Sequence, residues 1–160
     1  MRTLIAAALV LFAAPVQAGE PGAEAGRVLQ EAGLVGAWAV DCADPNEFDR
    51  ETIGPGPRGF FQSVMGGDDY LETYDIVAAR RLDGGDVEMA LRPVAEDEDG
   101  AGGGDAADLA VVYRVEGDRQ MTWSSIDAGG RPLITDGVLA GDGTQKSLWY
   151  HRCDAGRILP

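Results

Sequence analysis

The sequence predicts an all-β protein, an antiparallel up-and-down barrel of about eight strands preceded by a short helix, with a β-sandwich as the alternative. Three observations predict this class. Short segments that alternate apolar and polar residues follow one another from residue 37 to the end of the chain. Glycine-rich turns separate these segments. None of the intervening stretches has the long helical pattern of a crossover in a parallel sheet.

The N-terminus has the pattern of a secretory signal peptide. Arg2 precedes an apolar run over residues 4–14, and small residues lead to Ala18. We expect a signal peptide over residues 1–18, cleaved after Ala18, and therefore a periplasmic or secreted protein. The apolar run is too short to span a bilayer, so no membrane anchor is expected after cleavage.

The predicted N-terminal segment covers residues 19–35 and contains one helix. Val28, Leu29 and Ala32 share a face of a helix over residues 23–34. Gly33 or Gly36 can end this helix. A single β-domain over residues 36–160 follows.

The strands of this domain are predicted from alternation and from the turns between them. They lie at residues 37–42, 48–53, 59–65, 70–82, 87–91, 109–115 and 120–126, in a hairpin over 133–140, and at 147–153. The stretch at 70–82 fits a bent strand, with a helix as the alternative.

The turns carry their own signals. Residues 54–57 read Gly-Pro-Gly-Pro and are predicted to be a turn, because prolines fit neither a helix nor a central strand. Asp136-Gly137 between two apolar segments predicts a two-residue hairpin. Residues 95–108 are rich in Gly, Ala, Asp and Glu, and we expect a mobile acidic surface loop there.

The two cysteines of the chain, Cys42 and Cys153, bracket the β-domain. In an oxidising compartment they predict one disulfide, with a free pair or intermolecular bonds as alternatives. The bond would place the first and last strands side by side, as in a closed barrel. By alternation the first cysteine shares its face with Trp38 and Val40, and the second with Trp149 and His151. We expect these side chains to face the interior.

The aromatic residues of the strands give the candidates for a binding cavity. An eight-stranded barrel has an interior that is either filled by side chains or holds one small ligand. The predicted cavity-lining residues are Trp38, Val40, Tyr113, Trp123, Trp149 and His151.

The start of the domain resembles a known family. A short helix leading into Gly36-x-Trp38, followed by a meander, resembles the lipocalin and wider calycin group. The resemblance implies that Trp38 plugs one end of the barrel beneath a basic residue near the last strand. Alternation points Arg152 away from Cys153, so Arg157 is expected in that role. The lipocalin Thr-Asp-x-x-Tyr motif is absent. Residues 36–45, together with Asp136-Gly137 and residues 148–153, also resemble small secreted bacterial proteins of unknown function.

Charge and residue types narrow the chemistry. A net charge of −14 argues against nucleic acids and anionic membranes and is compatible with a basic partner. The chain has one histidine, and its cysteines are assigned to the disulfide, so no metal site is predicted. The chain contains no Gly-x-Ser-x-Gly motif. We expect no cofactor and no enzymatic activity.

Two functions are compatible with this pattern. The first is a non-enzymatic barrel that binds a small, mainly apolar ligand. The alternative is an inhibitor or binding module for a basic protein, such as lysozyme or a protease.

Overall fold

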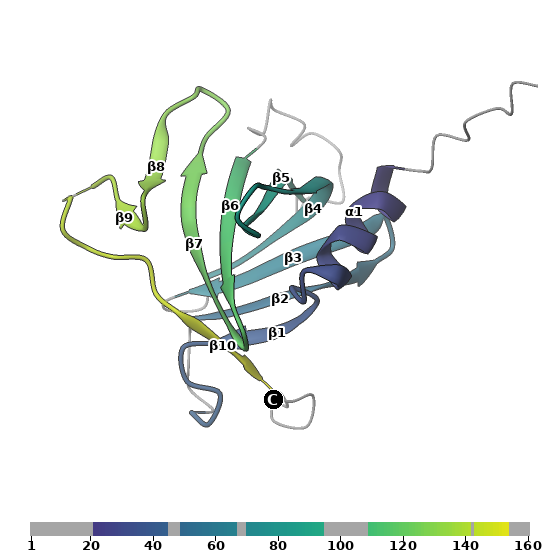
Figure 1. Ribbon diagram of the computed structural model, residues 1–160, viewed down its shortest axis with the longest axis horizontal. Coiled ribbons are helices and arrows are strands. Elements are labelled where there is room, and N and C mark those ends of the chain that lie inside the picture. The colour runs from purple at the N-terminus through teal and green to yellow at the C-terminus, as the bar shows by residue number, and fades with distance from the viewer. Residues whose placement is uncertain (1–20, 45–48, 67–69, 95–108, 142, 154–160) are drawn as a thin grey trace, which may run out of the picture.

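The computed structural model describes residues 21–44, 49–66, 70–94, 109–141 and 143–153. The predicted signal peptide with its cleavage after Ala18, the loop at 95–108 and Arg157 lie outside these residues. One helix, α1 (Pro21–Glu31), precedes the described strands (Figure 1). The strands are β1 (Gly36–Ala39), β2 (Arg50–Gly56), β3 (Gly59–Gly66), β4 (Tyr70–Arg81), β5 (Val87–Pro93), β6 (Leu109–Glu116), β7 (Arg119–Ile126), β8 (Pro132–Thr135), β9 (Val138–Leu139) and β10 (Tyr150–Cys153).

The strands form one antiparallel sheet that closes into a barrel. Its order is β10-β1-β2-β3-β4-β5-β6-β7-β8-β9, and β10 also pairs with β7. The wall therefore consists of β1 to β7 and β10, whereas β8 and β9 form a hairpin attached to the outer edge of β7. The eight-stranded up-and-down barrel predicted from the sequence is confirmed, and the sandwich alternative is wrong.

Helix α1 closes one end of the barrel (Figure 1). Its apolar residues and those of the following turn share a core with inward-facing strand residues, because a helix with one apolar face must bury that face. The members of this core are Ala25, Leu29, Leu34, Ile53, Ile76, Val87, Met89, Leu91, Val111 and Tyr113.

Two local predictions for the strands have different outcomes. The bent strand expected at residues 70–82 is found as β4, and the bend is a register shift between Ile76 and Ala78. The turn expected at 54–57 is wrong, because β2 continues through Pro55 to Gly56 and pairs with β3 there. Strand β1 stops opposite Ile53. Beyond that point β2 pairs only with β3, so Pro55 occupies edge-like backbone, where a missing N–H is tolerated.

The hairpin β8–β9 forms at the predicted Asp136-Gly137 turn. Asp136 and Gly137 have φ of 51° and 74°, the left-handed values that a tight hairpin of this kind requires. Gly137 also packs on β7, and a Cβ at this position would lie 3.0 Å from Met121 and 3.3 Å from Trp123. The backbone of Gly137 donates a hydrogen bond of 2.7 Å to the carbonyl of Trp123. The glycine thus fixes the hairpin against the outer face of the barrel.

Candidate functional site

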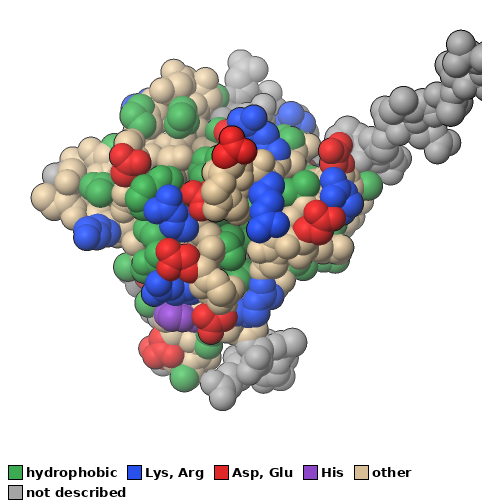
Figure 2. Space-filling model, viewed as in Figure 1, with side chains coloured by type: hydrophobic (Ala, Val, Ile, Leu, Met, Phe, Trp, Pro, Cys, Tyr) green, Lys and Arg blue, Asp and Glu red, His purple; other side chains and the backbone are tan. Residues whose placement is uncertain are grey.

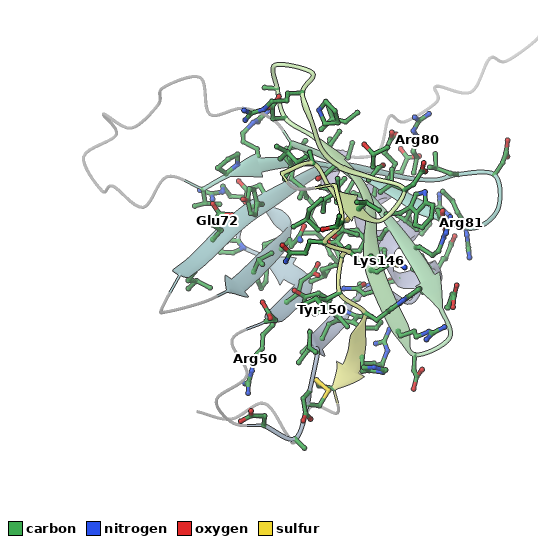
Figure 3. All side chains as sticks on the ribbon, turned by 90° about the vertical axis from the view of Figure 1, so that its left-hand side faces the viewer. Arg50, Glu72, Arg80, Arg81, Lys146 and Tyr150 are labelled. Carbon is green, nitrogen blue, oxygen red and sulfur yellow. A yellow bond between two sulfur atoms is a disulfide. The ribbon has the colours of Figure 1, made fainter. Side chains whose placement is uncertain are left out.

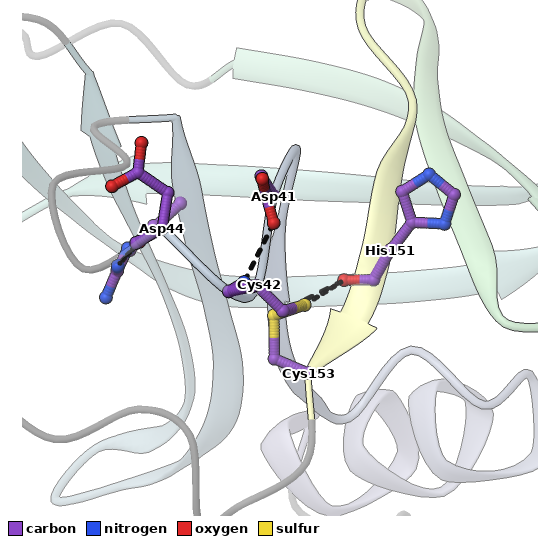
Figure 4. The surroundings of a disulfide bond; sticks show 7 residues. Asp41, Cys42, Asp44, His151 and Cys153 are labelled. Atoms are coloured by element: carbon purple, nitrogen blue, oxygen red, sulfur yellow. Dashed lines mark hydrogen bonds between the residues drawn. A yellow bond between two sulfur atoms is a disulfide. The ribbon is translucent and has the colours of Figure 1, made fainter.

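The disulfide joins the ends of the barrel wall. Cys42 and Cys153 are bonded across 111 residues, as predicted (Figure 4). Strand β1 pairs with β10 in the register Ala37↔Cys153 and Ala39↔His151. The predicted adjacency of the first and last strands is therefore confirmed.

The predicted orientation of β10 is wrong by one residue. Tyr150 pairs with the fully buried Gln120 of β7, so Tyr150 faces inward and its neighbours Trp149 and His151 face outward. The His151 side chain is exposed and visible on the surface in Figure 2. The error arose because strand β1 ends at Ala39, so strand alternation does not extend to Cys42. The sulfur of Cys42 instead lies 3.6 Å from the His151 carbonyl oxygen.

Trp38, the residue expected to plug one end of the barrel, lies beside the turn that follows α1. Trp38 is buried, and its indole N–H donates a 2.9 Å hydrogen bond to the carbonyl of Leu34. The guanidinium of Arg152 lies 4.4 Å from the centroid of the Trp38 ring and donates to the carbonyls of Val35 and Gly33. Arg152 pairs with Trp38 in the β1–β10 ladder. Arg152 therefore makes the contact with Trp38 that the resemblance implies for a basic residue, whereas Arg157, expected in that role, lies outside the described residues.

The remaining predicted cavity residues divide between the two faces. Tyr113 is buried in the interior, and Val40, two residues after Trp38, is half-buried. Trp123 lies on the outer face beneath Gly137, with the Arg114 guanidinium 3.5 Å from its ring centroid. The guanidinium of Arg119 lies 4.4 Å from the centroid of the Trp149 ring. Both tryptophans therefore bind arginines on the outer face instead of lining a cavity.

Four inward-facing polar residues from four strands form a buried cluster that the sequence analysis did not anticipate. Glu51 of β2 is at its centre, and Gln62 of β3, Tyr113 of β6 and Gln120 of β7 surround it. Their exposed fractions are 4, 3, 3 and 0%. We call these residues the Glu51 cluster.

The Glu51 carboxyl accepts a hydrogen bond from each of its three neighbours. Oε1 accepts from Nε2 of Gln62 at 2.9 Å and from the hydroxyl of Tyr113 at 2.8 Å. Oε2 accepts from Nε2 of Gln120 at 3.1 Å. The Gln62 amide also lies 2.7 Å from the Tyr113 hydroxyl. All three donors to Glu51 are uncharged, so the described hydrogen bonds give the carboxylate no compensating cation.

Burial dominates the electrostatics of the cluster. Desolvation raises the pKa of Glu51 to about 7, although the hydrogen bonds from Tyr113 and Gln120 oppose this shift. Burial, together with the nearby Glu51 charge, raises the pKa of Tyr113 well above its ordinary value. Glu51 consequently changes charge near neutral pH, whereas Tyr113 remains a neutral donor.

Two buried acceptors in the cluster are unsatisfied. The side-chain oxygens of Gln62 and Gln120 have no hydrogen-bond partner in the described part of the chain. A buried amide oxygen without a partner costs about 1–3 kcal/mol. Native interiors nearly always satisfy such groups with protein atoms, water or a ligand.

Several described side chains that face inward at the barrel end away from α1 are only half-buried. Near α1, inward-facing residues such as Ile53 and Val87 are fully buried. Towards the other end, the inward-facing residues keep exposed surface; they are Val64, Glu72, Tyr74, Leu109 and Tyr150. Figure 3 views the molecule from the side away from α1, and Glu72 and Tyr150 there come from opposite walls of the barrel. We call this end the mouth.

The sequence contained a signal for part of the cluster. Glu51 alternates in phase with the apolar Ile53, and Gln62 with Phe60, whereas Gln120 is in phase with the polar Thr122 and Ser124. A polar residue on an otherwise apolar strand face predicts a buried polar group. The predicted cavity residues were chosen mainly among the aromatic side chains, so the polar ones were not included. No local sequence pattern shows that four separate strands bring these four side chains together.

A hollow lies beside the β2–β3 turn and β4. It has a volume of about 320 Å³ and is lined by Pro57, Phe61, Thr73 and Val94, among others. Arg58 and Asp75 form a 2.8 Å ion pair in its wall. No described feature of this groove identifies an occupant, so it supports no functional assignment.

The described residues contain no group of three or more His, Cys, Asp or Glu side chains arranged to hold a metal ion. Within the same residues, no helix has the length and apolar character needed to cross a membrane. Comparison with known proteins found no matching family model, no matching curated protein and no matching solved structure.

Proposed function

We propose that this protein is a non-enzymatic binding barrel. Its ligand is a small molecule with a mainly apolar body and a hydrogen-bond-donating head group. The ligand enters through the mouth, and its head group reaches the Glu51 cluster. This proposal keeps the small apolar ligand expected from the sequence and adds a polar anchor that the sequence did not indicate.

The unsatisfied oxygens of Gln62 and Gln120 carry the proposal. Both belong to side chains that are almost completely buried, and both are held beside Glu51 by their own amide nitrogens. A head group with N–H or O–H donors would satisfy them. The half-buried Val64, Tyr74 and Leu109 offer apolar surface between the cluster and the mouth for the rest of the ligand.

The setting proposed for this activity is outside the cytoplasm. The Cys42–Cys153 disulfide is characteristic of an oxidising compartment. The N-terminal signal pattern ending at Ala18 supports export to the periplasm or the medium. The short helix, the Gly36-x-Trp38 strand and the Arg152 contact on Trp38 support a distant lipocalin-like origin.

Native mass spectrometry of protein exported in cells tests the proposal. We expect a bound small molecule of defined mass that is lost on denaturation. Gln62→Leu together with Gln120→Leu removes both unsatisfied oxygens, and we expect it to release the ligand while circular dichroism shows an intact barrel. The same double substitution at the exposed Gln30 and Gln145 is the control. A wild-type protein that remains ligand-free after exposure to cell extract would contradict the proposal.

A second candidate function is binding of a basic protein. The net charge of −14 favours such a partner, and four large apolar side chains among the described residues are exposed: Leu71, Ile126, Leu133 and Leu148. Retention on immobilised lysozyme at 50 and 150 mM salt tests the lysozyme version. Loss of Leu133 or Leu148 should weaken a genuine complex. Retention that disappears at 150 mM salt and ignores both substitutions would indicate non-specific charge attraction.

A further inference from the structure

The acceptors left over in the Glu51 cluster match one type of head group. A carboxylate has about four lone-pair positions. Oε1 of Glu51 accepts two hydrogen bonds and Oε2 accepts one, so one position on Oε2 remains. The free oxygens of Gln62 and Gln120 add two acceptors. The cluster thus offers three acceptor groups, which are Oε2 of Glu51 and the side-chain oxygens of Gln62 and Gln120.

We infer that the head group is a protonated amine, whose three N–H donors pair with Oε2 of Glu51 and with the side-chain oxygens of Gln62 and Gln120. This inference rests on the proposed function and names the class of ligand. An ammonium group has three donors and no acceptor. An alcohol has a single donor and would leave acceptors unpaired. A carboxylate or phosphate ligand has acceptors only and would be repelled by Glu51.

The charge of the cluster supports the same class. Ionised Glu51 is buried among uncharged donors, and a buried charge is costly unless an opposite charge compensates it. A ligand ammonium beside Oε2 would supply that charge. The inward-facing Glu72 at the mouth adds a second acidic side chain on the route from solvent.

A ligand-free arrangement also satisfies part of the cluster. If Glu51 is protonated and the side-chain amide of one glutamine is flipped, so that its oxygen and nitrogen exchange positions, the carboxyl O–H of Glu51 donates a hydrogen bond to that oxygen. The amide orientation of a glutamine is assigned from its hydrogen bonds, so both orientations are compatible with the same side-chain positions. In this arrangement the cluster is a neutral structural network, and it has no preference for amines.

Three probes with the same octyl chain separate these possibilities. Octylamine, octanol and octanoate are titrated at pH 8, where Glu51 is mostly ionised and the amine is protonated. Isothermal calorimetry gives the affinities. Tryptophan fluorescence reports on the interior, because Trp38 pairs with Glu51 across β1 and β2. A background of 300 mM NaCl screens attraction of the amine to the acidic surface.

We expect octylamine to bind at least tenfold more tightly than octanol, and octanoate to bind most weakly. Glu51→Gln keeps the shape of the side chain and should abolish the preference for the amine, so that octylamine and octanol bind the variant with affinities within about twofold of each other. Gln120→Leu should reduce the affinity for octylamine severalfold. It replaces Glu51→Gln as the test variant if Glu51→Gln does not fold. Glu116→Gln removes the same charge from the exposed β6–β7 turn, and we expect it to retain the full preference.

The outcomes separate the two levels of the proposal. Equal binding of octylamine and octanol would overturn the ammonium inference and leave the binding function intact. An amine preference that survives Glu51→Gln would also overturn it, because the preference would then come from the surface. A wild-type protein that binds none of the three probes and carries no cellular ligand would refute the proposed function itself.

Discussion

Glu51 occupies an unfavourable position for a carboxyl group. It is an acidic group with an exposed fraction of 4%, and its hydrogen-bond donors are two amides and a phenol. Burial raises its pKa to about 7 from an ordinary value of 4.5. The folded state therefore holds this proton more tightly than the unfolded state does. Stability is fullest below pH 4.5 and falls as pH rises towards 7, where the folded form must also ionise.

Glu51→Gln should remove this dependence on pH. Between pH 4.5 and 7 the wild-type free energy of unfolding is expected to fall by about 3 kcal/mol more than that of the variant. Urea unfolding at half-unit pH steps, followed by tryptophan fluorescence, measures the difference. Glu116→Gln, which alters an exposed carboxyl, should follow the wild-type curve. Parallel curves for wild type and Glu51→Gln would show that Glu51 does not titrate in this range.

Arg152 gives a second prediction at the residue scale. It combines a cation–π contact with Trp38 and hydrogen bonds to the carbonyls of Val35 and Gly33. Lysine keeps the charge but has no planar fork, so it cannot make these contacts together. We expect Arg152→Lys to lower the free energy of unfolding by about 1–2 kcal/mol. Arg27→Lys on the exposed face of α1 is the control, and we expect it to have no resolvable effect. Equal stability of the two variants would contradict a stabilising role of the Arg152 contacts.

At the scale of elements, most strands followed from the sequence because they alternate apolar and polar residues and are separated by turn signals, whereas the signal at residues 54–57 lies mostly within β2. Val87, Met89 and Leu91 alternate with polar neighbours and are buried as expected. The hairpin at Asp136-Gly137 follows from backbone conformation alone. Local pattern therefore predicted these elements and their antiparallel order.

The Glu51 cluster and the inward face of β10 could not be predicted from the sequence, because both depend on how several strands pair. Alternation was extended from Trp38 to Cys42 across the end of β1, and this assigned the wrong face to Trp149 and His151. Trp123 lies next to the irregularity between Val112 and Tyr113, where β6 and β7 change register. Sequence alternation does not reveal where a strand ends or bulges, so side-chain direction beyond such points could not be predicted.

The β1–β10 pairing gives the prediction for the disulfide. The bond joins residues 111 apart, and the chain-entropy estimate for a loop of this length is about 4–5 kcal/mol. Cys42→Ser with Cys153→Ser should lower the free energy of unfolding by about 2–5 kcal/mol, since native ladder contacts keep the folded barrel closed. Dithiothreitol should destabilise the wild type equally and leave the variant unchanged. A variant as stable as the oxidised wild type would contradict this account.

The molecule as a whole carries a strong negative charge that local ion pairs do not neutralise. The net charge is −14. In the face shown in Figure 2, red and blue side chains are interspersed. Described pairs such as Arg27–Glu31 and Arg119–Glu116 are exposed, so each contributes little. Net self-repulsion consequently weakens the folded state at neutral pH.

The dependence of stability on salt should distinguish the effect of this general repulsion from the effect of the buried charge on Glu51. Exposed carboxylates are screened by 0.5 M NaCl, so we expect the melting temperature at pH 8 to rise by a few degrees in wild type and in Glu51→Gln alike. The difference between the two proteins should persist, because a buried carboxylate is screened far less than a surface one. Differential scanning calorimetry at pH 5 and 8, with and without salt, measures both effects. A gap between wild type and Glu51→Gln that closes in high salt would place the Glu51 charge in solvent, and it would remove the physical basis for a buried anionic anchor in this barrel.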